Sequence, residues 1–204
     1  MSHDTSQIKE FWNEQPVGSN FVAYEQDRAF YERYDAFRYR TESHILEELD
    51  AIIAETQKEV ADITRQYGSR PVTYLAQINF LNNRTIAAHV VYANDEEIDL
   101  LKSLGVGIAH NPQSNMKLAS GVAPVPKMLD KDLPVGLGTD GAASNNDLNL
   151  WEEMDTAAKL HKVASFDPKV VTAEEAFALA TIGGARALHM DSDIGSLEEG
   201  KRAD

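Results

Sequence analysis

Short apolar runs alternate with amphipathic stretches over most of this chain. The apolar runs lie near residues 52, 85, 106 and 135, and each is short enough to be a buried strand. Between them, apolar side chains recur every three or four residues, as they do on one face of a helix. This alternation predicts an α/β fold, in which about four parallel strands are joined by right-handed helical crossovers.

Capping and turn residues set the expected limits of several helices. Thr56 and Glu59 have the spacing of a capping box, and the helix that they begin is expected to end at Gly68. A second helix is expected to begin near Pro71, because proline is favoured in the first turn. Further helices are expected over residues 95–104, in the later part of 116–129, over 148–163, and from 172 onward with an interruption at Gly183 and Gly184.

Composition and charge exclude several classes of protein. The 204 residues are 43% hydrophobic, which is enough to bury a core. The net charge of −14 would repel nucleic acid and anionic membranes, so neither is an expected partner. No apolar run approaches the ~20 residues that span a bilayer, and the amino terminus lacks the pattern of a signal peptide, so a cytoplasmic location is expected. Because cysteine is absent, any metal must be held by His, Asp or Glu.

Residues 1–50 differ in amino-acid composition from the rest of the chain. Aromatic side chains are interleaved with arginines, a mixture that also occurs in proteins that stack single-stranded nucleic acid. Phe30, Tyr34 and Phe37 are spaced to share one face of a helix. With the acidic net charge, this spacing favours a packed amphipathic segment over a nucleic-acid surface.

The same segment resembles a known amino-terminal lead-in. The runs FWNEQPVGSNFV (11–22) and FYERYDAFRYRTESHILEEL (30–49) are similar to the start of a family of S-adenosylmethionine-dependent methyltransferases. In that family a strand and a glycine-rich loop that holds the cofactor follow the lead-in. Here no G-x-G occurs before Gly105. The resemblance therefore implies a helical lead-in over residues 1–50 without the cofactor site.

Ionisable residues recur at the expected carboxyl ends of the four strands. These are Glu55, His89, His110 and Asp140, and in a parallel sheet such strand ends share one rim, so their side chains can converge on one site. Small residues follow Asp140 in the run GTDGAASNN and leave room for a close neighbour. Two alternatives stay open, since Asp140 can cap a tight turn and polar residues at strand ends can serve solvation alone.

Two long runs carry a more specific resemblance. TIAAHVVYANDEEIDLLKSLGVGIAHNPQSNMKLASGVAPV (85–125) and GLGTDGAASNNDLNLWEEM (136–154) resemble the amidohydrolase superfamily, and within it the 5'-methylthioadenosine/S-adenosylhomocysteine deaminases and related chlorohydrolases. The similarity extends over about residues 53–204. It implies a (β/α)8 barrel, a TIM-type fold, of which residues 52–204 would form the carboxyl-terminal half, truncated before the family's β-sandwich. It also implies zinc or another divalent metal.

The resemblance implies roles for individual residues. Asp140 in GTDG matches the family's metal-ligand aspartate, which also shuttles a proton, and His89 in AAH matches the histidine that orients the metal-bound hydroxide. Glu55 in IIAET matches a glutamate that contacts the purine ring. Ser144 matches a serine near the substrate. His110 matches a structural rim motif, AHNP, and is left out of the expected site.

The chain departs from the family pattern at the metal. Ile52 stands where the family's H-x-x-E motif has histidine, and the six histidines include no H-x-H pair. Of the family's four ligands only Asp140 remains, whereas a catalytic zinc site normally keeps about three protein ligands. We therefore expect weak or no zinc binding and no activity by the chain alone.

The expected activity is hydrolytic deamination of an adenine-type nucleoside, a small-molecule purine substrate. A non-catalytic half-barrel that forms a homo-oligomer to cover its open sheet edges is the first alternative. An S-adenosylmethionine-dependent methyltransferase fragment, supported by residues 1–50 alone, is the second. The change between the two resemblances falls between Asp50 and Ile53, and the segments on its two sides are expected to pack poorly against each other.

Overall fold

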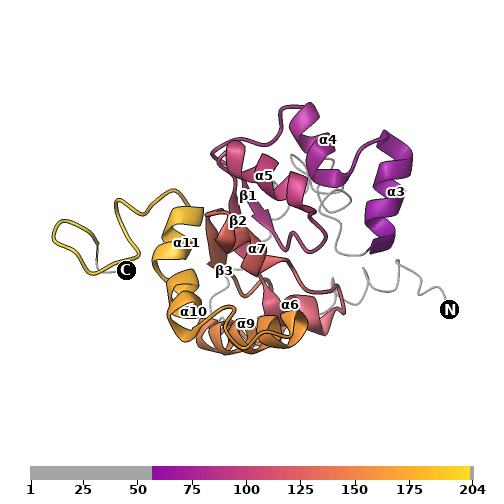
Figure 1. Ribbon diagram of the computed structural model, residues 1–204. Coiled ribbons are helices and arrows are strands. Elements are labelled where there is room, and N and C mark those ends of the chain that lie inside the picture. The colour runs from indigo at the N-terminus through magenta and orange to yellow at the C-terminus, as the bar shows by residue number, and fades with distance from the viewer. Residues whose placement is uncertain (1–56, 203–204) are drawn as a thin grey trace, which may run out of the picture. The chain divides into compact units, whose positions relative to one another are not determined.

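Three short parallel strands form the single sheet of the computed structural model, which describes residues 57–202 (Figure 1). They are β1 (Ile86–Ala88), β2 (Gly107–His110) and β3 (Val135–Leu137), in the spatial order β1-β2-β3. Ala87 pairs with Ile108, and Ala109 pairs with Gly136. The predicted α/β arrangement is confirmed for these three strands. The predicted strand near residue 52, Glu55, the methyltransferase-like segment 1–50 and the junction at 50–53 lie outside the described residues.

Helices precede, separate and follow the strands, as the sequence pattern predicts. Within the described residues, β1 is preceded by α3 (Gln57–Tyr67) and α4 (Pro71–Gln77), and α5 (Asp95–Ser103) lies between β1 and β2. The connection from β2 to β3 contains α6 (Pro112–Lys117) and α7 (Val125–Asp130). After β3 come α8 (Ala142–Asn145), α9 (Leu150–Ser165), α10 (Ala173–Ala180) and α11 (Ile182–Ala187).

Local capping explains where several helices begin and end. Thr172 and Glu175 form the predicted capping box at the start of α10, and Asn94 forms another with Glu97 at the start of α5. Each box satisfies backbone N–H groups that the first turn of a helix leaves without partners. Gly68 ends α3 with a φ of +72°, a conformation that glycine adopts without steric cost.

The predictions were wrong at three places, the first being α8 (Ala142–Asn145), where no helix was expected. Residues 112–117 form α6, although no helix was expected there. The last helix is interrupted at Thr181, with φ −125° and ψ −103°, and not at Gly183 and Gly184, which lie inside α11. The buried positions of α6 include polar residues, namely Ser114 and Asn115, so the helix lacks the periodic apolar face by which helices are predicted from sequence.

Glycines let α11 pack directly against the sheet. A Cβ atom added to Gly136 of β3 would lie 2.6 Å from the Cα atom of Gly184 in α11. A Cβ atom on Gly107 of β2 would overlap the carbonyl oxygen of Ala187. Both approaches are closer than any real Cβ contact. The glycines of α11 and of the sheet are therefore there for close packing and do not mark a helix end.

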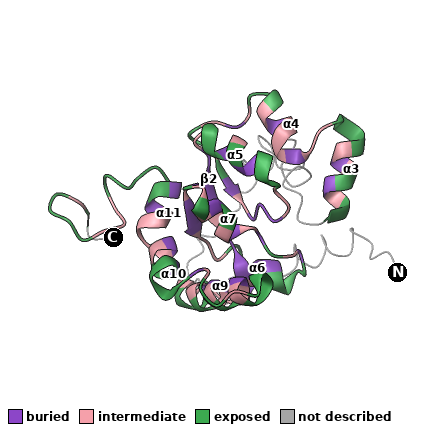
Figure 2. Cartoon of the chain, viewed as in Figure 1, coloured by how far each residue is buried: buried purple, intermediate pink, exposed green. Residues whose placement is uncertain are grey.

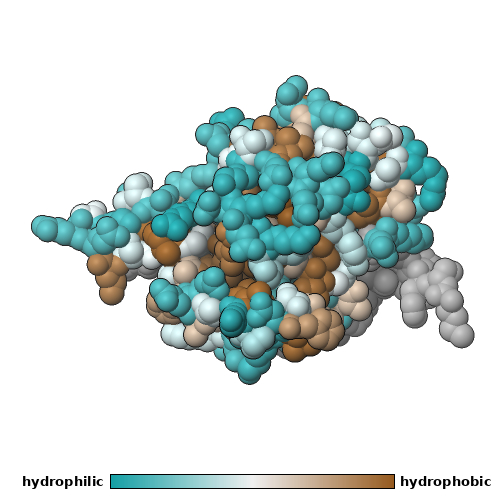
Figure 3. Space-filling model, viewed as in Figure 1, coloured by the Kyte–Doolittle hydropathy of each residue, from teal (hydrophilic) through white to brown (hydrophobic). Residues whose placement is uncertain are grey.

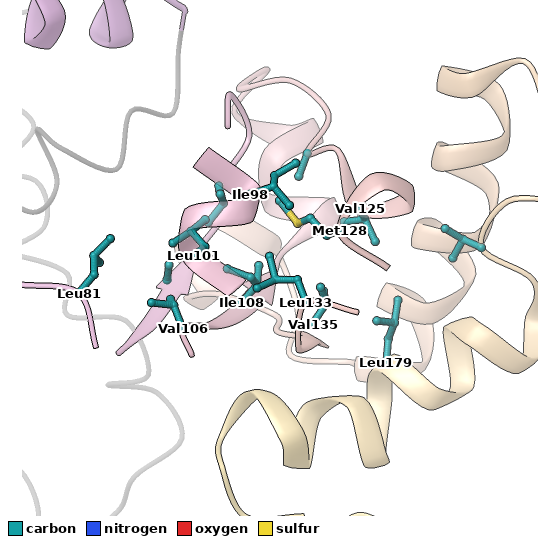
Figure 4. Packing of buried hydrophobic residues seen from close by; sticks show 14 of the residues in the cluster. Leu81, Ile98, Leu101, Val106, Ile108, Val125, Met128, Leu133, Val135 and Leu179 are labelled. Atoms are coloured by element: carbon teal, nitrogen blue, oxygen red, sulfur yellow. The ribbon is translucent and has the colours of Figure 1, made fainter. Parts of the chain in front are cut away.

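The core lies between the sheet and the helices that connect its strands. Ile98 and Leu101 of α5, Ile108 of β2, Met128 of α7 and Val135 of β3 are each at most 2% exposed, and Figure 4 shows their side chains gathered at the sheet. Figure 2 shows the matching pattern on the ribbon, with buried residues on the strands and exposed residues on the outer turns of the helices. Burial of side chains of this size stabilises the fold by about 1.5–3 kcal/mol each.

The surface of the described part is mostly hydrophilic on the face shown in Figure 3. Within residues 57–202 no helix has the length and apolar composition needed to cross a bilayer. Large apolar side chains that are exposed include Trp151 at the start of α9, Phe166 at its C-cap, and Leu197 after α11. Single exposed apolar residues of this kind are common on protein surfaces.

Candidate active site

His89 and Asp140 come together at the carboxyl ends of β1 and β3. Nε2 of His89 lies 3.9 Å from Oδ2 of Asp140. His89 directly follows β1, and Asp140 comes three residues after the end of β3. Both residues have a left-handed backbone, with φ values of +64° and +60°, which is uncommon outside glycine. A left-handed residue cannot continue an extended strand. The two predicted side chains meet at one rim of the sheet.

Two serine hydroxyls hold the carboxylate of Asp140. Ser144 donates a hydrogen bond of 2.6 Å to Oδ2, and Ser114 donates one of 2.7 Å to the same oxygen. Burial alone would raise the pKa of this carboxyl, but the hydrogen bonds from Ser144, Ser114 and the backbone of Gly141 outweigh it and hold the pKa below its ordinary value. Asp140 is therefore ionised at neutral pH. Ser144, which was expected near the substrate, contacts the aspartate.

Two asparagines contact the imidazole ring of His89. Nδ1 lies 2.7 Å from Oδ1 of Asn115, and Nε2 lies 3.5 Å from Nδ2 of Asn111. The backbone N–H of His89 donates to the carbonyl of Ala109 in β2, at 2.9 Å. His89 is 9% exposed and Asn115 only 1% exposed. The ring is held from the backbone and from both of its nitrogens.

Sequence reasoning missed the contribution of α6 and its N-cap. Asn111, Ser114 and Asn115 all lie in the run HNPQSN, whose first part was set aside as a structural rim motif. All three are buried. The available signal was a polar run directly after a buried strand, with proline in the first helical turn. Buried polar side chains need partners, and here the partners are the two predicted site residues.

A buried carboxylate on α9 is hydrogen-bonded to α6 and α8, the two helices that contain Ser114 and Ser144. Glu153 is fully buried and accepts hydrogen bonds from the Asn145 side chain of α8 and from the backbone N–H of Gln113 in α6. Asn145 also donates to the carbonyl of Thr139, at 2.6 Å. Burial raises the pKa of Glu153 above its ordinary value, which the hydrogen bonds partly offset. Glu153 thus fixes α6 and α8 relative to α9.

His110 is buried in a different histidine pair. It is the last residue of β2, and its Nε2 lies 3.0 Å from Nε2 of His161 on α9. Burial lowers the pKa of His161 to about 4, and burial together with the neighbouring His161 lowers the pKa of His110 well below its ordinary value. Both rings are neutral at pH 7, so one donates an N–H to the other. His110, which was left out of the expected site, thus contacts His161 through its Nε2.

The described residues do not supply a complete metal site. Over positions 57–202 no group of three His, Asp or Glu side chains could hold a metal ion. Asp140 and His89 are close, but Oδ2 of Asp140 already accepts two hydroxyl groups. A catalytic zinc site normally has about three protein ligands, so the donors present do not fit such a site by themselves.

Comparison with known proteins identifies relatives of this chain. Residues 44–204 match the model of the amidohydrolase family. A 5-methylthioadenosine/S-adenosylhomocysteine deaminase of Syntrophobacter fumaroxidans is 50% identical over 152 residues, which cover 74% of this chain and 35% of that protein. A 5'-deoxyadenosine deaminase of Methanobrevibacter smithii is 46% identical over 172 residues, or 84% of this chain and 38% of that protein.

A solved structure shows the same fold over the same part of the chain. It is an adenosine deaminase of Xanthomonas campestris with bound zinc, which superposes with a TM-score of 0.71 at 44% identity. The superposition covers 74% of this chain and 34% of that one. The chain thus spans about a third of the length of the relatives that it matches. Because the family model covers well over half of its residues, this chain belongs to the amidohydrolase family.

Proposed function

We propose that this chain carries part of the active site of a hydrolase that deaminates adenine-type nucleosides. The observation that carries the proposal is the approach of His89 Nε2 to Asp140 Oδ2, at 3.9 Å, at the carboxyl ends of two parallel strands. Enzymes with parallel barrels place catalytic groups at this position. The names of relatives about half identical to this chain support an adenine nucleoside as the substrate.

The reaction replaces the exocyclic amino group of the purine with oxygen from water and releases ammonia. Asp140 is ionised, so it can accept the proton of the attacking water and return it to the departing amino group. His89 lies beside it, where its imidazole can accept a hydrogen bond from the attacking water and orient it. We assign Glu55, outside the described residues, to contact with the purine ring. Ser144 is assigned to the substrate side of Asp140.

We further propose that the chain is inactive by itself. Asp140 is the one family metal ligand that it retains, Ile52 stands at a ligand position, and no H-x-H pair is present. A divalent metal in such enzymes makes water nucleophilic at neutral pH. The chain therefore provides the proton-transfer side of a site that its own donors do not complete. A non-catalytic role is the alternative that this incompleteness favours.

A chimera tests whether these residues can work in a deaminase. Residues 57–202 of this chain would replace the aligned residues of the Syntrophobacter fumaroxidans relative, and ammonia release from 5'-methylthioadenosine and S-adenosylhomocysteine would be measured. We expect the chimera to be active and the chain alone to be inactive. His89→Gln and Asp140→Asn in the chimera should each lower kcat by about 100-fold or more.

The matched control is His189→Gln, which alters an exposed histidine and should leave the activity unchanged. A chimera that unfolds cooperatively like its parent, yet releases no ammonia from any adenine nucleoside, would contradict the proposed function. That result would favour the non-catalytic half-barrel.

A further inference from the structure

The amide of Asn115 is buried at a position where a helix normally carries an apolar side chain. Asn115 lies in α6, is 1% exposed, and its Oδ1 lies 2.7 Å from Nδ1 of His89. Asparagine is not favoured inside helices, and a buried amide is costly unless it is paired. Its Nδ2 has no partner within the described part of the chain. The side chain is thus used through its oxygen, toward the histidine.

The contacts of the ring define which nitrogen carries the proton. A neutral imidazole has one N–H donor and one lone-pair acceptor. Oδ1 of Asn115 can only accept, so Nδ1 of His89 donates to it. Nδ2 of Asn111 can only donate, and it faces Nε2 at 3.5 Å, which places the lone pair on Nε2. The two asparagines favour the same tautomer.

We propose that Asn115 is a positioning residue that holds neutral His89 with its proton on Nδ1, so that the lone pair of Nε2 faces Asp140. This rests on the proposed function, in which His89 contacts the reacting oxygen. Nε2 is the ring nitrogen 3.9 Å from Oδ2 of Asp140, so it is the nitrogen that can accept a hydrogen bond or a proton at the site. A ring with its proton on Nε2 would present a donor there instead.

Two neighbouring residues of α6 form hydrogen bonds with His89 and Asp140. Ser114 donates to Oδ2 of Asp140, and the next residue, Asn115, contacts His89. Consecutive residues on a helix point about 100° apart, so one turn can reach two groups on either side of it. The backbone of α6 is in turn fixed by Glu153, which accepts from the N–H of Gln113. The residue that contacts Nδ1 of His89 therefore lies on a helix, α6, whose backbone is hydrogen-bonded to Glu153 of α9.

The test measures the tautomer directly and needs no catalysis. Long-range hydrogen–nitrogen NMR correlations of the full chain, labelled with nitrogen-15 in histidine, distinguish a protonated from an unprotonated ring nitrogen. Spectra would be recorded at a pH where the imidazole is neutral, and His89→Gln would assign the signal. We expect a protonated Nδ1 and an unprotonated Nε2 for His89. Exposed His189 serves as the internal reference, because its signal should stay the same in every variant.

Two variants separate positioning from packing. Asn115→Leu removes the acceptor, and we expect the ratio of the Nδ1–H to the Nε2–H form to fall by about tenfold, which is what one net hydrogen bond contributes to an equilibrium. Asn115→Asp retains an acceptor oxygen and should keep the proton on Nδ1.

A wild-type spectrum with the proton of His89 on Nε2 overturns the proposal even if neither variant folds. An unchanged ratio in folded Asn115→Leu overturns it as well. Activity of the chimera is a separate readout, so failure of the deaminase assay leaves this measurement intact.

Discussion

Single side chains decide the charge of the candidate proton carrier. The carboxylate of Asp140 is partly buried, and burial by itself would favour its neutral form. Hydrogen bonds donated by Ser144, Ser114 and the backbone of Gly141, together with the nearby His89, outweigh this effect and lower the pKa of Asp140. Sequence similarity alone placed one of these serines near the substrate and did not single out the other. Their effect on Asp140 gives each of them a measurable consequence.

Removing either hydroxyl should raise the pKa of Asp140. Ser144→Ala and Ser114→Ala each delete a donor that stabilises the charged carboxylate, and we expect the larger rise for Ser144→Ala because its hydrogen bond lowers the pKa more. Carbon-13 NMR titration of the labelled carboxyl would measure the change. Ser103→Ala, which alters an exposed hydroxyl on α5, is the control and should leave the pKa of Asp140 unchanged. A pKa that stays constant in both serine variants would refute this account of the site.

The buried histidine pair should make the fold sensitive to mild acid. The pKa of His161 is lowered by burial from 6.5 to about 4, so the unfolded chain binds more protons than the folded chain between these values. The free energy of unfolding should therefore fall as the pH drops from 7 toward 4, by up to about 1.4 kcal/mol per pH unit for each proton. Denaturant unfolding at pH 7 and pH 5 would measure it.

The histidine variants sharpen this prediction. His161→Gln removes one titrating group, so the loss of stability between pH 7 and pH 5 should be smaller than in the wild type. His189→Gln, in which the altered side chain is exposed, should show the wild-type loss. Equal pH dependence in His161→Gln and wild type would show that the pair does not cause the acid sensitivity.

At the scale of elements, α11 packs closely against β2 and β3. The strands approach the helix so closely that Gly136 faces the backbone of Gly184 without room for a side chain. Such contacts involve residues far apart in the sequence, so no local pattern indicates them. The two glycines of this contact nevertheless differ in what they tolerate, because the added atoms would point in different directions.

A matched pair of alanine substitutions tests this contact. Gly136→Ala places a Cβ atom 2.6 Å from the Cα atom of Gly184, which requires a backbone shift and should lower the free energy of unfolding by about 1–3 kcal/mol. In Gly184→Ala the nearest atom is the carbonyl oxygen of Leu179 at 3.4 Å, an ordinary contact. That substitution should be neutral or stabilise α11 by up to about 1 kcal/mol, because alanine is the better helix former. Denaturant unfolding of both variants is the measurement, and equal destabilisation would contradict the packing described.

As a whole molecule, the chain belongs to a family whose solved relative holds zinc, while the donors of its described part fall short of a complete site. We therefore predict weak or no zinc binding by the chain at micromolar metal. Isothermal titration calorimetry and metal analysis after dialysis would measure it. Tight zinc binding at one ion per chain that is lost in Asp140→Ala would show that a ligand has been overlooked. Asp155→Ala, which alters an exposed carboxylate on α9, is the control.

Local sequence was enough to predict the strands and most helices of the described part. Strands β1, β2 and β3 are short apolar runs between turn residues, and their pairing follows from the alternation with helices. The capping box at Thr172 and the helix end at Gly68 are also local, since they depend on neighbouring residues within one turn. The position of His89 and Asp140 at one rim follows from their place at the ends of parallel strands. These features are fixed by near neighbours in the chain.

Only the tertiary structure shows how the site is supported. The contacts of Ser114 with Asp140 and of Asn115 with His89 each join residues 26 positions apart, and Glu153 accepts from Gln113 across 40 positions. The polar run of α6 has no apolar period, so its helix and its role were both hidden until its partners were in place. The sequence by itself determined which residues could act, because strand ends and turn chemistry are local. Long-range packing decided which of these residues are in contact and which are charged. The physical reason is that burial and hydrogen bonds between distant elements determine the pKa of each ionisable group.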